Sequence, residues 1–384
     1  MDADVIVIGL GALGSATCWQ LAQRGARVLG IDRHAPPHDF GSSHGLSRIT
    51  RLAVGEGPEY VPLVRRSHAL WREIEGVSGH TLMHATGGLV IGRTAGGAGM
   101  HGQDDFVAST LAVARDAGIE HEVLSADAVR ARFPPFVLRD DERACYEPTA
   151  GVLFPEACVA AQLALARRAG AALRTGEAVQ TIQREGSTLV VRSATDTHRA
   201  SQVLVTAGAW IPSLLASDWP QRLRVQRQTL HWLKPTTPAA FAPERCPIFI
   251  WAHGPSHVDA FYGIPLVDGT GGVKLGTQQH EVDTAPDALD HDVSATETTA
   301  LYERHVRGRI DGLSATRLRA AACLYTVALG ARFIVERHPS LQGCTVASAC
   351  SGHGFKHSAA LGEALAQQLI DGRSAIDLSV FGLR

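Results

Sequence analysis

The hydrophobic pattern at the start of the chain predicts a strand, a glycine turn, a helix and a second strand. Residues 4–9, DVIVIG, form a short run of β-branched and apolar residues, which is typical of a strand buried on both faces. Residues 10–25 favour a helix that Gly25 ends, and residues 27–32, RVLGID, predict the second strand. This order of elements is the opening of a dinucleotide-binding unit.

The rest of the chain alternates between segments with helical and with strand-like spacing of apolar residues. Residues 33–57 are rich in glycine and histidine and predict a loop. Residues 220–285 contain short apolar runs between prolines and glycines, which predict an antiparallel sheet. Residues 344–372 favour a strand, a glycine loop and a long helix. Further helices are expected at residues 60–75, 105–118, 157–170 and 294–308, and further strands at residues 87–93, 187–193 and 202–210.

Segments of the nucleotide-binding type occur at both ends of the chain and near its middle. We therefore expect an α/β fold in which a Rossmann-like domain is built from discontinuous segments, with an α+β domain containing an antiparallel sheet inserted between them. The Rossmann-like domain is predicted to comprise residues 1–82, 150–215 and 320–384. The inserted domain, which we expect to bind the substrate, is predicted to comprise residues 83–149 and 216–319.

Composition and charge limit the class of protein. The chain has 384 residues, of which 45% are hydrophobic, enough for more than one core. Its net charge of −2 and the lack of a long basic run argue against a nucleic-acid partner, and no apolar run is long enough to cross a membrane. The acidic start does not resemble a signal peptide, and seven cysteines without a CxxC pair predict neither a disulfide framework nor a metal site. A cytoplasmic protein fits these features best.

The first glycine turn carries a nucleotide-binding pattern. Gly9, Gly11 and Gly14 fit GxGxxG between the predicted strand and helix. In this context the first glycine permits a tight turn, the second lets the backbone approach a pyrophosphate, and the third lets the helix pack on the strand. Asp32, at the end of the second strand, can accept hydrogen bonds from ribose hydroxyls. The motif does not distinguish FAD from NAD, and a turn with only a structural role remains an alternative.

Two further turns follow predicted strands and could contact a cofactor. In VLVTAGAW, a close backbone approach at Ala207 and Gly208 is one interpretation, and an ordinary core strand followed by a helix cap is the other. Residues 351–358, SGHGFKHS, contain two glycines whose neighbouring amides could face an anion or a ring carbonyl beside His353 and Lys356. A solvated loop with chance charges is the alternative there.

Single residues in three other segments could carry chemistry. Arg48 and Arg51 are three residues apart, so in a helix or a tight turn they would share a face and could bind a carboxylate, although a solvated pair is the commoner arrangement. Lys274, in GGVKLG, could point outward or supply positive charge beside a cofactor. Cys323, in RAAACLYT, could be a packed thiol, a nucleophile, a metal ligand or an anchor for a bound group.

Together these segments resemble the family of monomeric sarcosine oxidase and N-methyltryptophan oxidase, which are flavoproteins of the D-amino-acid-oxidase-like fold. The resemblance covers nearly the whole chain and rests on DVIVIGLGALGSA, GSSHGLSRITRLAVGEGPEYVPL, GVLFPE, FYGIP, KLG, CLYT and SGHGFK. It implies FAD as the cofactor, joined to Cys323 by a thioether at its 8α carbon. It also implies a monomer whose partners are a small amine and oxygen.

The resemblance further implies the residues of the site. The implied catalytic residues are Lys274, which activates oxygen, His353, Arg48 and Tyr325. The implied substrate-binding residues are Arg51 and Lys356, which hold a carboxylate, Tyr262 and Gln278. The implied cofactor-binding residues are Gly9, Gly11, Ala12, Leu13, Gly14, Asp32, Arg33, Ser42, Ser43, His44, Arg48, Val179, Ala207, Gly208, Trp210, Cys323, Gly352, His353, Gly354, Phe355 and Lys356.

The chain departs from this family at two places. After KLG the family commonly has an aromatic or basic residue and then histidine, whereas this chain has Thr277 and Gln278. After CLYT the family usually has a TPDEHF-like run, whereas this chain has VALGARF at residues 327–333. Both departures bear on the identity of the substrate more than on flavin binding.

The resemblance implies oxidation of a secondary, N-methylated amino acid. The carbon next to nitrogen would transfer a hydride to the flavin, the imine would hydrolyse, and oxygen would be reduced to hydrogen peroxide. The first alternative is an oxidase or dehydrogenase of the same fold that acts on a cyclic imino acid or a larger natural-product amine. The second is a non-catalytic nucleotide-binding protein, which would have no need for Cys323, Lys274, Arg51, His353 and Lys356 together.

Overall fold

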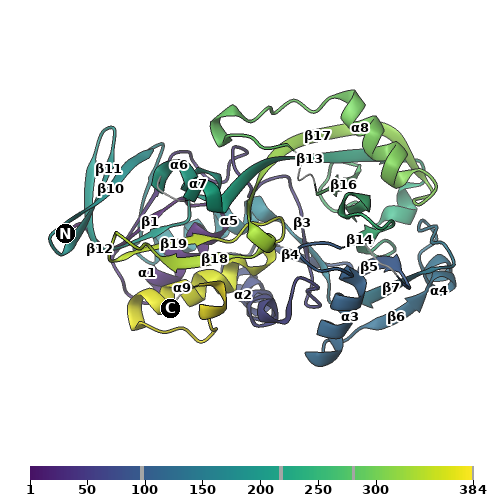
Figure 1. The fold of residues 1–384 in the computed structure, drawn as a ribbon, viewed down its shortest axis with the longest axis horizontal. Coiled ribbons are helices and arrows are strands. Elements are labelled where there is room, and N and C mark those ends of the chain that lie inside the picture. Colours follow the sequence, from purple (N-terminus) through teal and green to yellow (C-terminus); the bar gives the residue numbers. More distant parts are fainter. Residues whose placement is uncertain (96–98, 216–218, 279–281, 383–384) are drawn as a thin grey trace.

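Two large β-sheets, one in each half of the molecule, dominate the structure (Figure 1). The computed structural model describes residues 1–95, 99–215, 219–278 and 282–382. A small third sheet joins β3 (Arg48–Thr50), β8 (Gly151–Leu153) and β4 (Met83–Ala85) in that order. Among the helices in the described residues, none is long and apolar enough to span a membrane.

The first sheet is parallel at its centre, as a Rossmann-like fold requires. It contains β1 (Ala3–Ile8), β2 (Val28–Asp32), β9 (Ala172–Thr175), β10 (Val179–Glu185), β11 (Thr188–Ser193), β12 (Thr197–Val205), β18 (Ile334–Arg337) and β19 (Cys344–Ser348). Adjacent strands are parallel in the order β19, β12, β1, β2, β9, while β10, β11 and β18 add antiparallel edges. The apolar run ADVIVI is continuous because β1 is buried along nearly its whole length.

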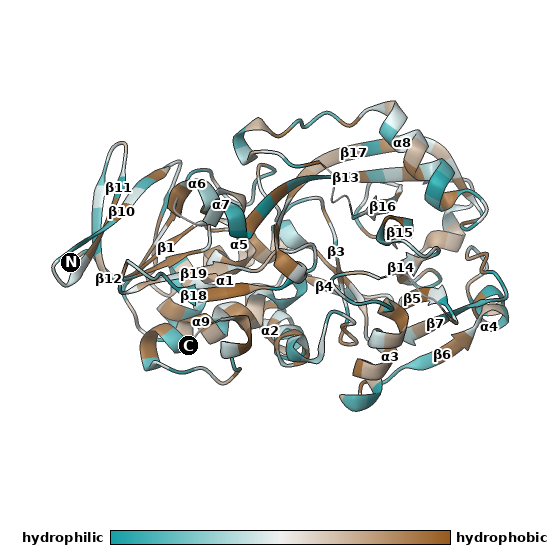
Figure 2. Ribbon diagram, in the orientation of Figure 1, coloured by the Kyte–Doolittle hydropathy of each residue, from teal (hydrophilic) through white to brown (hydrophobic). Residues whose placement is uncertain are grey.

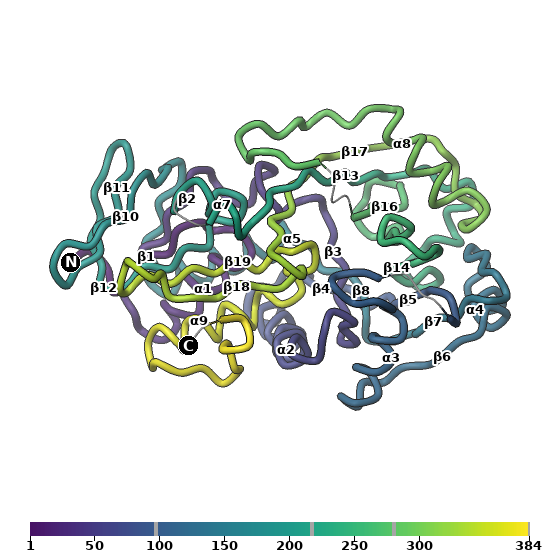
Figure 3. Tube along the Cα trace, in the orientation of Figure 1, coloured from purple at the N-terminus to yellow at the C-terminus, as the bar shows by residue number. Residues whose placement is uncertain are grey.

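Helices from the beginning, middle and end of the chain pack together beside this sheet. The helix α1 (Ala12–Gln23) packs against α5 (Pro155–Arg168) and α9 (Ser358–Asp371), and α2 (Val61–Ser78) packs against α9. Figure 3 shows the purple N-terminal and the yellow C-terminal segments in the same half of the molecule. The expectation of a nucleotide-binding domain built from discontinuous segments is therefore confirmed.

The second sheet is mixed rather than purely antiparallel. Its strands, in spatial order, are β17 (Leu313–Ala328), β13 (Leu223–Pro235), β16 (Val273–Thr277), β15 (Ala260–Ile264), β14 (Ile248–Ala252), β5 (Gly88–Arg93), β7 (Glu142–Glu147) and β6 (Glu122–Ser125). The expected antiparallel pairing holds except between β14 and β5, which are parallel. Helices α3 (Phe106–Asp116), α4 (Ala126–Arg132) and α8 (Ala295–Leu301) contact its strands.

The apolar residues gather in separate cores. Figure 2 shows brown, hydrophobic segments along the central strands and teal, hydrophilic segments at the edges of both halves. One buried cluster lies between the first sheet and its helices, and it includes Trp71 and Leu361. Another lies in the second half and includes Phe249 and Trp251. Each half thus buries its own apolar residues, as two structural units would.

The long strands β13 and β17 extend from the second sheet toward the first half (Figure 1). They pair from Leu223 opposite Ala328 to Pro235 opposite Leu313. The predicted domain boundary between residues 319 and 320 therefore falls inside β17. Cys323 lies on the second sheet, although we assigned its segment to the nucleotide-binding domain. The other predicted boundaries stay predictions.

Three predicted elements differ in their bounds. The strand expected at residues 202–210 ends at Val205, because a 3₁₀ turn at Gly208–Trp210 takes the chain out of the sheet. The helix expected at residues 294–308 is α8 followed by a π-helical turn at Tyr302–Val306. The loop expected at residues 33–57 contains β3, whose partners on β8 come from a distant part of the sequence.

Candidate active site

A cavity of about 440 Å³ runs from the ends of the parallel strands to the face of the second sheet. Ligands of doubly wound sheets bind at the carboxyl ends of parallel strands, and the volume is in the usual range for ligand pockets. All the predicted site residues line it except Gly14, His44 and Cys323.

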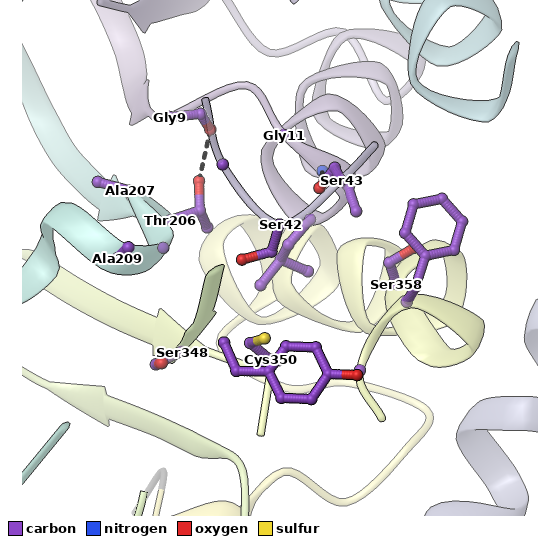
Figure 4. Close-up of a pocket in the computed structure, with 18 of the residues that line it drawn as sticks. Gly9, Gly11, Ser42, Ser43, Thr206, Ala207, Ala209, Ser348, Cys350 and Ser358 are labelled. Atoms are coloured by element: carbon purple, nitrogen blue, oxygen red, sulfur yellow. Dashed lines mark hydrogen bonds between the residues drawn. The ribbon is translucent and has the colours of Figure 1, made fainter. Parts of the chain in front are cut away.

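The carboxyl ends of β1 and β12 approach each other at one end of the cavity. Gly9 has a φ of +91°, and a Cβ on it would lie 2.7 Å from the Ala207 Cα. The Thr206 hydroxyl donates to the Gly9 carbonyl at 2.7 Å, as Figure 4 shows. A Cβ on Gly14 would lie 1.8 Å from the Gly9 carbonyl oxygen, so this glycine permits the packing of α1 on β1 rather than contact with a ligand. The backbone at the start of α1 is thereby left bare for an anion.

Polar groups surround this end. The Asp32 carboxylate accepts from the Leu10 amide at 2.7 Å and from the His34 amide at 2.8 Å, and it lines the cavity. These bonds fix the carboxylate and leave lone pairs for hydroxyl groups of a ligand. On the other side, the Ser43 hydroxyl accepts from the Ala12 amide at 3.1 Å. Figure 4 shows Ser43 near the start of α1 and Cys350 across the same space.

Arg48 and Arg51 do not lie in a helix. Arg48 begins β3 and Arg51 follows its last residue, so the helix or tight turn on which a shared face depended is not formed. The Arg48 guanidinium donates to the carbonyls of Ser47 at 2.9 Å and Ser42 at 2.8 Å. Arg51 pairs with Glu56 at 2.8 Å. Both arginines nevertheless line the cavity, at different positions.

Glu56 joins Arg51 to Lys356 in a buried cluster. Its carboxylate lies 2.9 Å from Lys356 Nζ and 2.8 Å from an Arg51 nitrogen, and the side chains of these residues are at most 5% exposed. Burial opposes ionisation of Glu56, but Arg51 and Lys356 hold its pKa well below the usual value. Burial lowers the pKa of Lys356 to about 8. With two cations and one carboxylate, the cluster carries one uncompensated positive charge that suits a single anion.

The hydrogen bonds of His353 determine its tautomer. Its Nε2 lies 2.9 Å from the Ala331 carbonyl, which can only accept, so Nε2 carries the proton. Burial lowers the pKa of His353 to about 4, and the ring is neutral near pH 7. Its Nδ1 is buried and has no hydrogen-bond partner among the described residues, and it lies 3.9 Å from a Glu56 oxygen. Nδ1 is therefore an acceptor that is ready for a ligand N–H.

Lys274 is buried on β16, with 1% of its surface exposed. Its Nζ donates to the carbonyls of Gly45 at 2.7 Å and Ser47 at 2.6 Å, and it lies 3.3 Å from the Ser47 hydroxyl. Burial and, to a smaller extent, Arg48 lower the pKa of Lys274 well below its usual value. The three oxygens can accept from the three hydrogens of an ammonium group. Burial therefore disfavours the charged form of Lys274, whereas these hydrogen bonds favour it.

Cys323 lies beside the tyrosines that line the cavity. Cys323 and Tyr325 are two residues apart on β17, so their side chains point to the same face, and Tyr262 packs against the same cluster. Cys323 is 1% exposed and does not line the cavity. Burial raises the pKa of its thiol, while the nearby charges of Arg48 and Lys274 oppose that shift.

The sequence did not indicate Glu56 and His101 as residues of the site. Glu56 belongs to a segment that supported the family resemblance, but nothing in its spacing indicated that it contacts Lys356. His101 follows a glycine-rich stretch without a pattern, yet it lies 2.6 Å from Gln278. His44, which we expected near the cofactor ring, is buried but does not line the cavity, and burial lowers its pKa to about 3.

One group of side chains has the spacing of a cation site. Glu177, Asp196 and His198 bring their ligand atoms within 4.8 Å of one another. His198 already lies 2.8 Å from the Glu177 carboxylate, and Asp196 is exposed. The expectation of a protein without a metal stays a prediction.

Comparisons with known proteins agree with the geometry. A family model for FAD dependent oxidoreductases matches residues 4–368. The chain is 38% identical to monomeric sarcosine oxidase of Streptomyces avermitilis, over 99% of this chain and 97% of that protein. It is 31% identical to N-methyl-L-tryptophan oxidase of Yersinia pestis, over 100% and 99% of the two chains.

The fold agrees as well. It is similar to that of NikD, an unusual amino acid oxidase essential for nikkomycin biosynthesis, with a TM-score of 0.84 at 24% identity over 99% of this chain and 96% of that chain. The chain therefore belongs to the FAD-dependent oxidoreductase family, within the group of amine oxidases that includes monomeric sarcosine oxidase and N-methyl-L-tryptophan oxidase.

Proposed function

We propose that the protein oxidises a secondary, N-methylated amino acid with FAD and oxygen. The observation that carries this proposal is the buried cluster of Arg51, Lys356 and Glu56. Its two cations and one carboxylate leave one positive charge that a substrate carboxylate would balance. The cluster lies in the wall of the same cavity as the glycine turn at Gly9 and the amine of Lys274. An anion-binding group, a nucleotide-binding turn and a buried amine thus face one space.

The residues present fit FAD. The backbone at the start of α1 would face the pyrophosphate, beside the Ser43 hydroxyl to which the Ala12 amide donates. Asp32 would face the ribose, because both of its oxygens are held in place. Gly9 and Gly14 leave no side chain in the turn. When bound, FAD accepts a hydride from the carbon next to the substrate nitrogen and passes the electron pair to oxygen, which gives hydrogen peroxide.

Arg51 and Lys356 would bind the substrate carboxylate. Both are held by Glu56, so the substrate approaches a cluster whose cations are already positioned. Two cations and two carboxylates make the occupied cluster neutral, which removes the cost of its unpaired buried charge. A ligand without an anionic group would leave that charge unpaired.

His353 would orient the amine. Its unprotonated Nδ1 can accept a hydrogen bond from the substrate N–H, which turns the nitrogen and its neighbouring carbon toward the reaction centre. A neutral amine is the reactive form, because an ammonium has no lone pair to stabilise the imine that forms. Tyr262 and Tyr325 also line the cavity, and their rings would exclude water from the reacting carbon. The imine product then hydrolyses in water.

Lys274 would act on oxygen. A positive charge held rigidly at the cavity wall stabilises negative charge that develops on oxygen as it is reduced. Nζ is fixed by the carbonyls of Gly45 and Ser47, so no reorganisation is needed at that step.

Cys323 would hold the cofactor through a thioether. Formation of that bond would replace a C–H bond of the 8-methyl group of FAD with a C–S bond. The thiol and the methyl group would each lose a proton, and the released electron pair would reduce FAD and then pass to oxygen. Arg48 and Lys274 supply positive charge that opposes the effect of burial on the thiol. Cys323 is two residues from Tyr325 on β17, and Tyr325 lines the cavity. We also propose a monomer, as the family resemblance implies, and a cytoplasmic location, which fits the cysteine content.

A larger amine from natural-product synthesis is the second candidate substrate. Gln278 stands where the related oxidases commonly have histidine, and a protein of similar fold, NikD, is an oxidase essential for nikkomycin biosynthesis.

The test measures peroxide from the purified protein with sarcosine, N-methyl aromatic amino acids, proline, pipecolate and glycine, in wild type and in Lys356→Met. We expect wild type to produce peroxide from at least one N-methyl amino acid and the variant to show a strongly raised KM. The decarboxylated amines should be poor substrates for both. Equal rates with and without a substrate carboxylate would contradict the proposal.

A further inference from the structure

His101 lies in a tight turn at the substrate end of the cavity. Met100 and Gln103 form a two-residue bridge with bonds of 3.0 and 2.9 Å, and His101 between them has a φ of +51°. A residue other than glycine rarely adopts this conformation, which costs about 1–3 kcal/mol and is common where a side chain must be aimed at a site. The turn directs the imidazole into the cavity wall.

The surrounding contacts hold this turn. The Gln103 amide donates to the Glu56 carbonyl at 3.1 Å, which ties the turn to the carboxylate-binding cluster. The His101 ring makes an edge contact with His353, at a centroid distance of 4.9 Å, and a tilted contact with Phe106, at 5.9 Å. His101 thus lies between the cluster that would hold the substrate carboxylate and the end of β16.

Both departures from the family pattern meet at this turn. Gln278 lies 2.6 Å from His101 Nε2, and a Cβ on Gly102 would lie 3.0 Å from the Gly330 carbonyl. Gly330 belongs to the altered segment 327–333, and the carbonyl of the next residue, Ala331, accepts a hydrogen bond from His353 Nε2. Segments that are far apart in the sequence therefore form one wall. An imidazole is present in this wall, but it comes from His101 and not from position 278.

We infer that His101 and Gln278 form the specificity-determining wall of the site and select substrates whose side chain ends in a neutral hydrogen-bonding group, such as an amide or a hydroxyl. This inference rests on the proposed function, because it assumes that Arg51 and Lys356 bind the substrate carboxylate. The side chain of a substrate held there extends past His353 toward the pair. The Gln278 amide nitrogen can only donate, so one of its hydrogens and His101 Nε2 are used in their mutual contact. The amide oxygen, the second amide hydrogen and the Nδ1 hydrogen of His101 are the groups that would meet a ligand.

The chemistry of the wall excludes charged side chains. Burial lowers the pKa of His101 well below its usual value, so the ring stays neutral, and Gln278 is neutral at every pH. The charged groups that face His101 are Glu56, Lys356 and Arg51, which already pair with one another. A second charge from the substrate would be buried here without a partner, which is costly. Ile250 and Met100 supply the apolar remainder of the wall.

Paired substrates test the inference by activity. We would compare kcat/KM for N-methyl-L-asparagine and N-methyl-L-leucine, which are similar in size, in wild type, His101→Phe and Gln278→Met. The phenylalanine keeps the ring contacts with His353 and Phe106, and the methionine keeps the length of glutamine. We expect wild type to prefer the amide about tenfold, mostly through KM, and each variant to lose most of that preference. His121→Phe, outside the cavity, is the matched control and should keep it.

Binding of acids that cannot be oxidised provides a second measurement. The flavin-bound protein would be titrated with 3-carbamoylpropanoate and with 4-methylpentanoate, and the dissociation constants obtained from the change in flavin absorbance. Wild type should bind the amide about tenfold more tightly, and the two variants should bind both acids alike. If the acids bind in this way but no amine is oxidised, the inference is supported and the proposed function is contradicted. Amine oxidation with equal preference for the paired substrates, in wild type as in the variants, would overturn the inference alone.

Discussion

Replacement of Glu56 by glutamine separates the two roles of the buried cluster, stability and ligand binding. The Glu56 carboxylate is 2.8 Å from Arg51 and 2.9 Å from Lys356, and its side chain is 2% exposed. Removing one partner of a buried ion pair costs about 3–5 kcal/mol, because the remaining charge is left without compensation. We therefore expect Glu56→Gln to lower the free energy of unfolding by about that amount and to lower Tm.

The same change should tighten the binding of a carboxylate ligand. At an effective dielectric constant of about 20, two carboxylates about 5 Å apart repel each other by about 3 kcal/mol. Part of this gain is lost, because Glu56 raises the pKa of Lys356 and its removal makes that amine easier to deprotonate. We expect a Kd for acetate that is about tenfold lower in the variant. Saturating acetate should then raise Tm more in Glu56→Gln than in wild type.

The assay combines thermal unfolding with acetate titration followed by flavin absorbance. Glu59→Gln is the matched control. Glu59 lies in the same segment, but it is 26% exposed and its ion pair with Arg332 is longer, at 3.6 Å. It should change Tm and the acetate Kd little. A Glu56→Gln protein that binds acetate less tightly than wild type would contradict this expectation. Such a result would show that Glu56 helps the ligand bind, by positioning Arg51 and Lys356, more than it weakens binding by repelling the ligand's carboxylate.

Four further changes test other parts of the site. Cys323→Ala should release flavin on acid precipitation, whereas the wild-type precipitate should stay yellow. Cys350→Ala, a matched change in the cavity wall, should also give a yellow precipitate. A colourless wild-type precipitate would contradict the covalent link. Lys274→Met should slow reoxidation by oxygen at least tenfold and anaerobic reduction much less. In wild type, reoxidation should slow as pH rises, because the lowered pKa of Lys274 leaves less of the amine in the ammonium form. Equal effects of Lys274→Met on both half-reactions would contradict this role. Acetate affinity should fall as pH rises through about 8, where Lys356 loses its proton, and a flat profile from pH 7 to pH 9 would show that this amine does not bind the carboxylate. Gly14→Val should abolish flavin binding, because a Cβ there would lie 1.8 Å from the Gly9 carbonyl, and a normal flavin-to-protein ratio would contradict the assigned packing.

The sequence predicted those parts of the fold that depend on local pattern. The opening strand, glycine turn and helix follow from the apolar run and the spacing of Gly9, Gly11 and Gly14, and the structure has β1, α1 and β2 within one or two residues of the predicted bounds. The strand expected to reach residue 210 was too long, because an apolar run does not show where a turn takes the chain out of the sheet.

The site was less accessible from the sequence because its contacts join distant segments. Glu56 and Lys356 are 300 residues apart, and His101 and Gln278 are 177 residues apart, so no spacing rule relates them. A shared face for Arg48 and Arg51 depended on a helix or tight turn, but pairing of β3 with the distant strand β8 makes residues 48–50 extended. Family resemblance supplied the residues that local pattern could not, and it gave no indication of His101.

Anaerobic mixing of the flavin-bound protein with a secondary amino acid shows whether such an amine reduces the flavin. With the best substrate of the panel, the visible absorbance of the flavin should disappear in proportion to the amine added, and it should return when oxygen is admitted. The Lys356→Met variant should need much more substrate for the same bleaching. A flavin absorbance that no carboxylate-bearing amine changes would contradict the account.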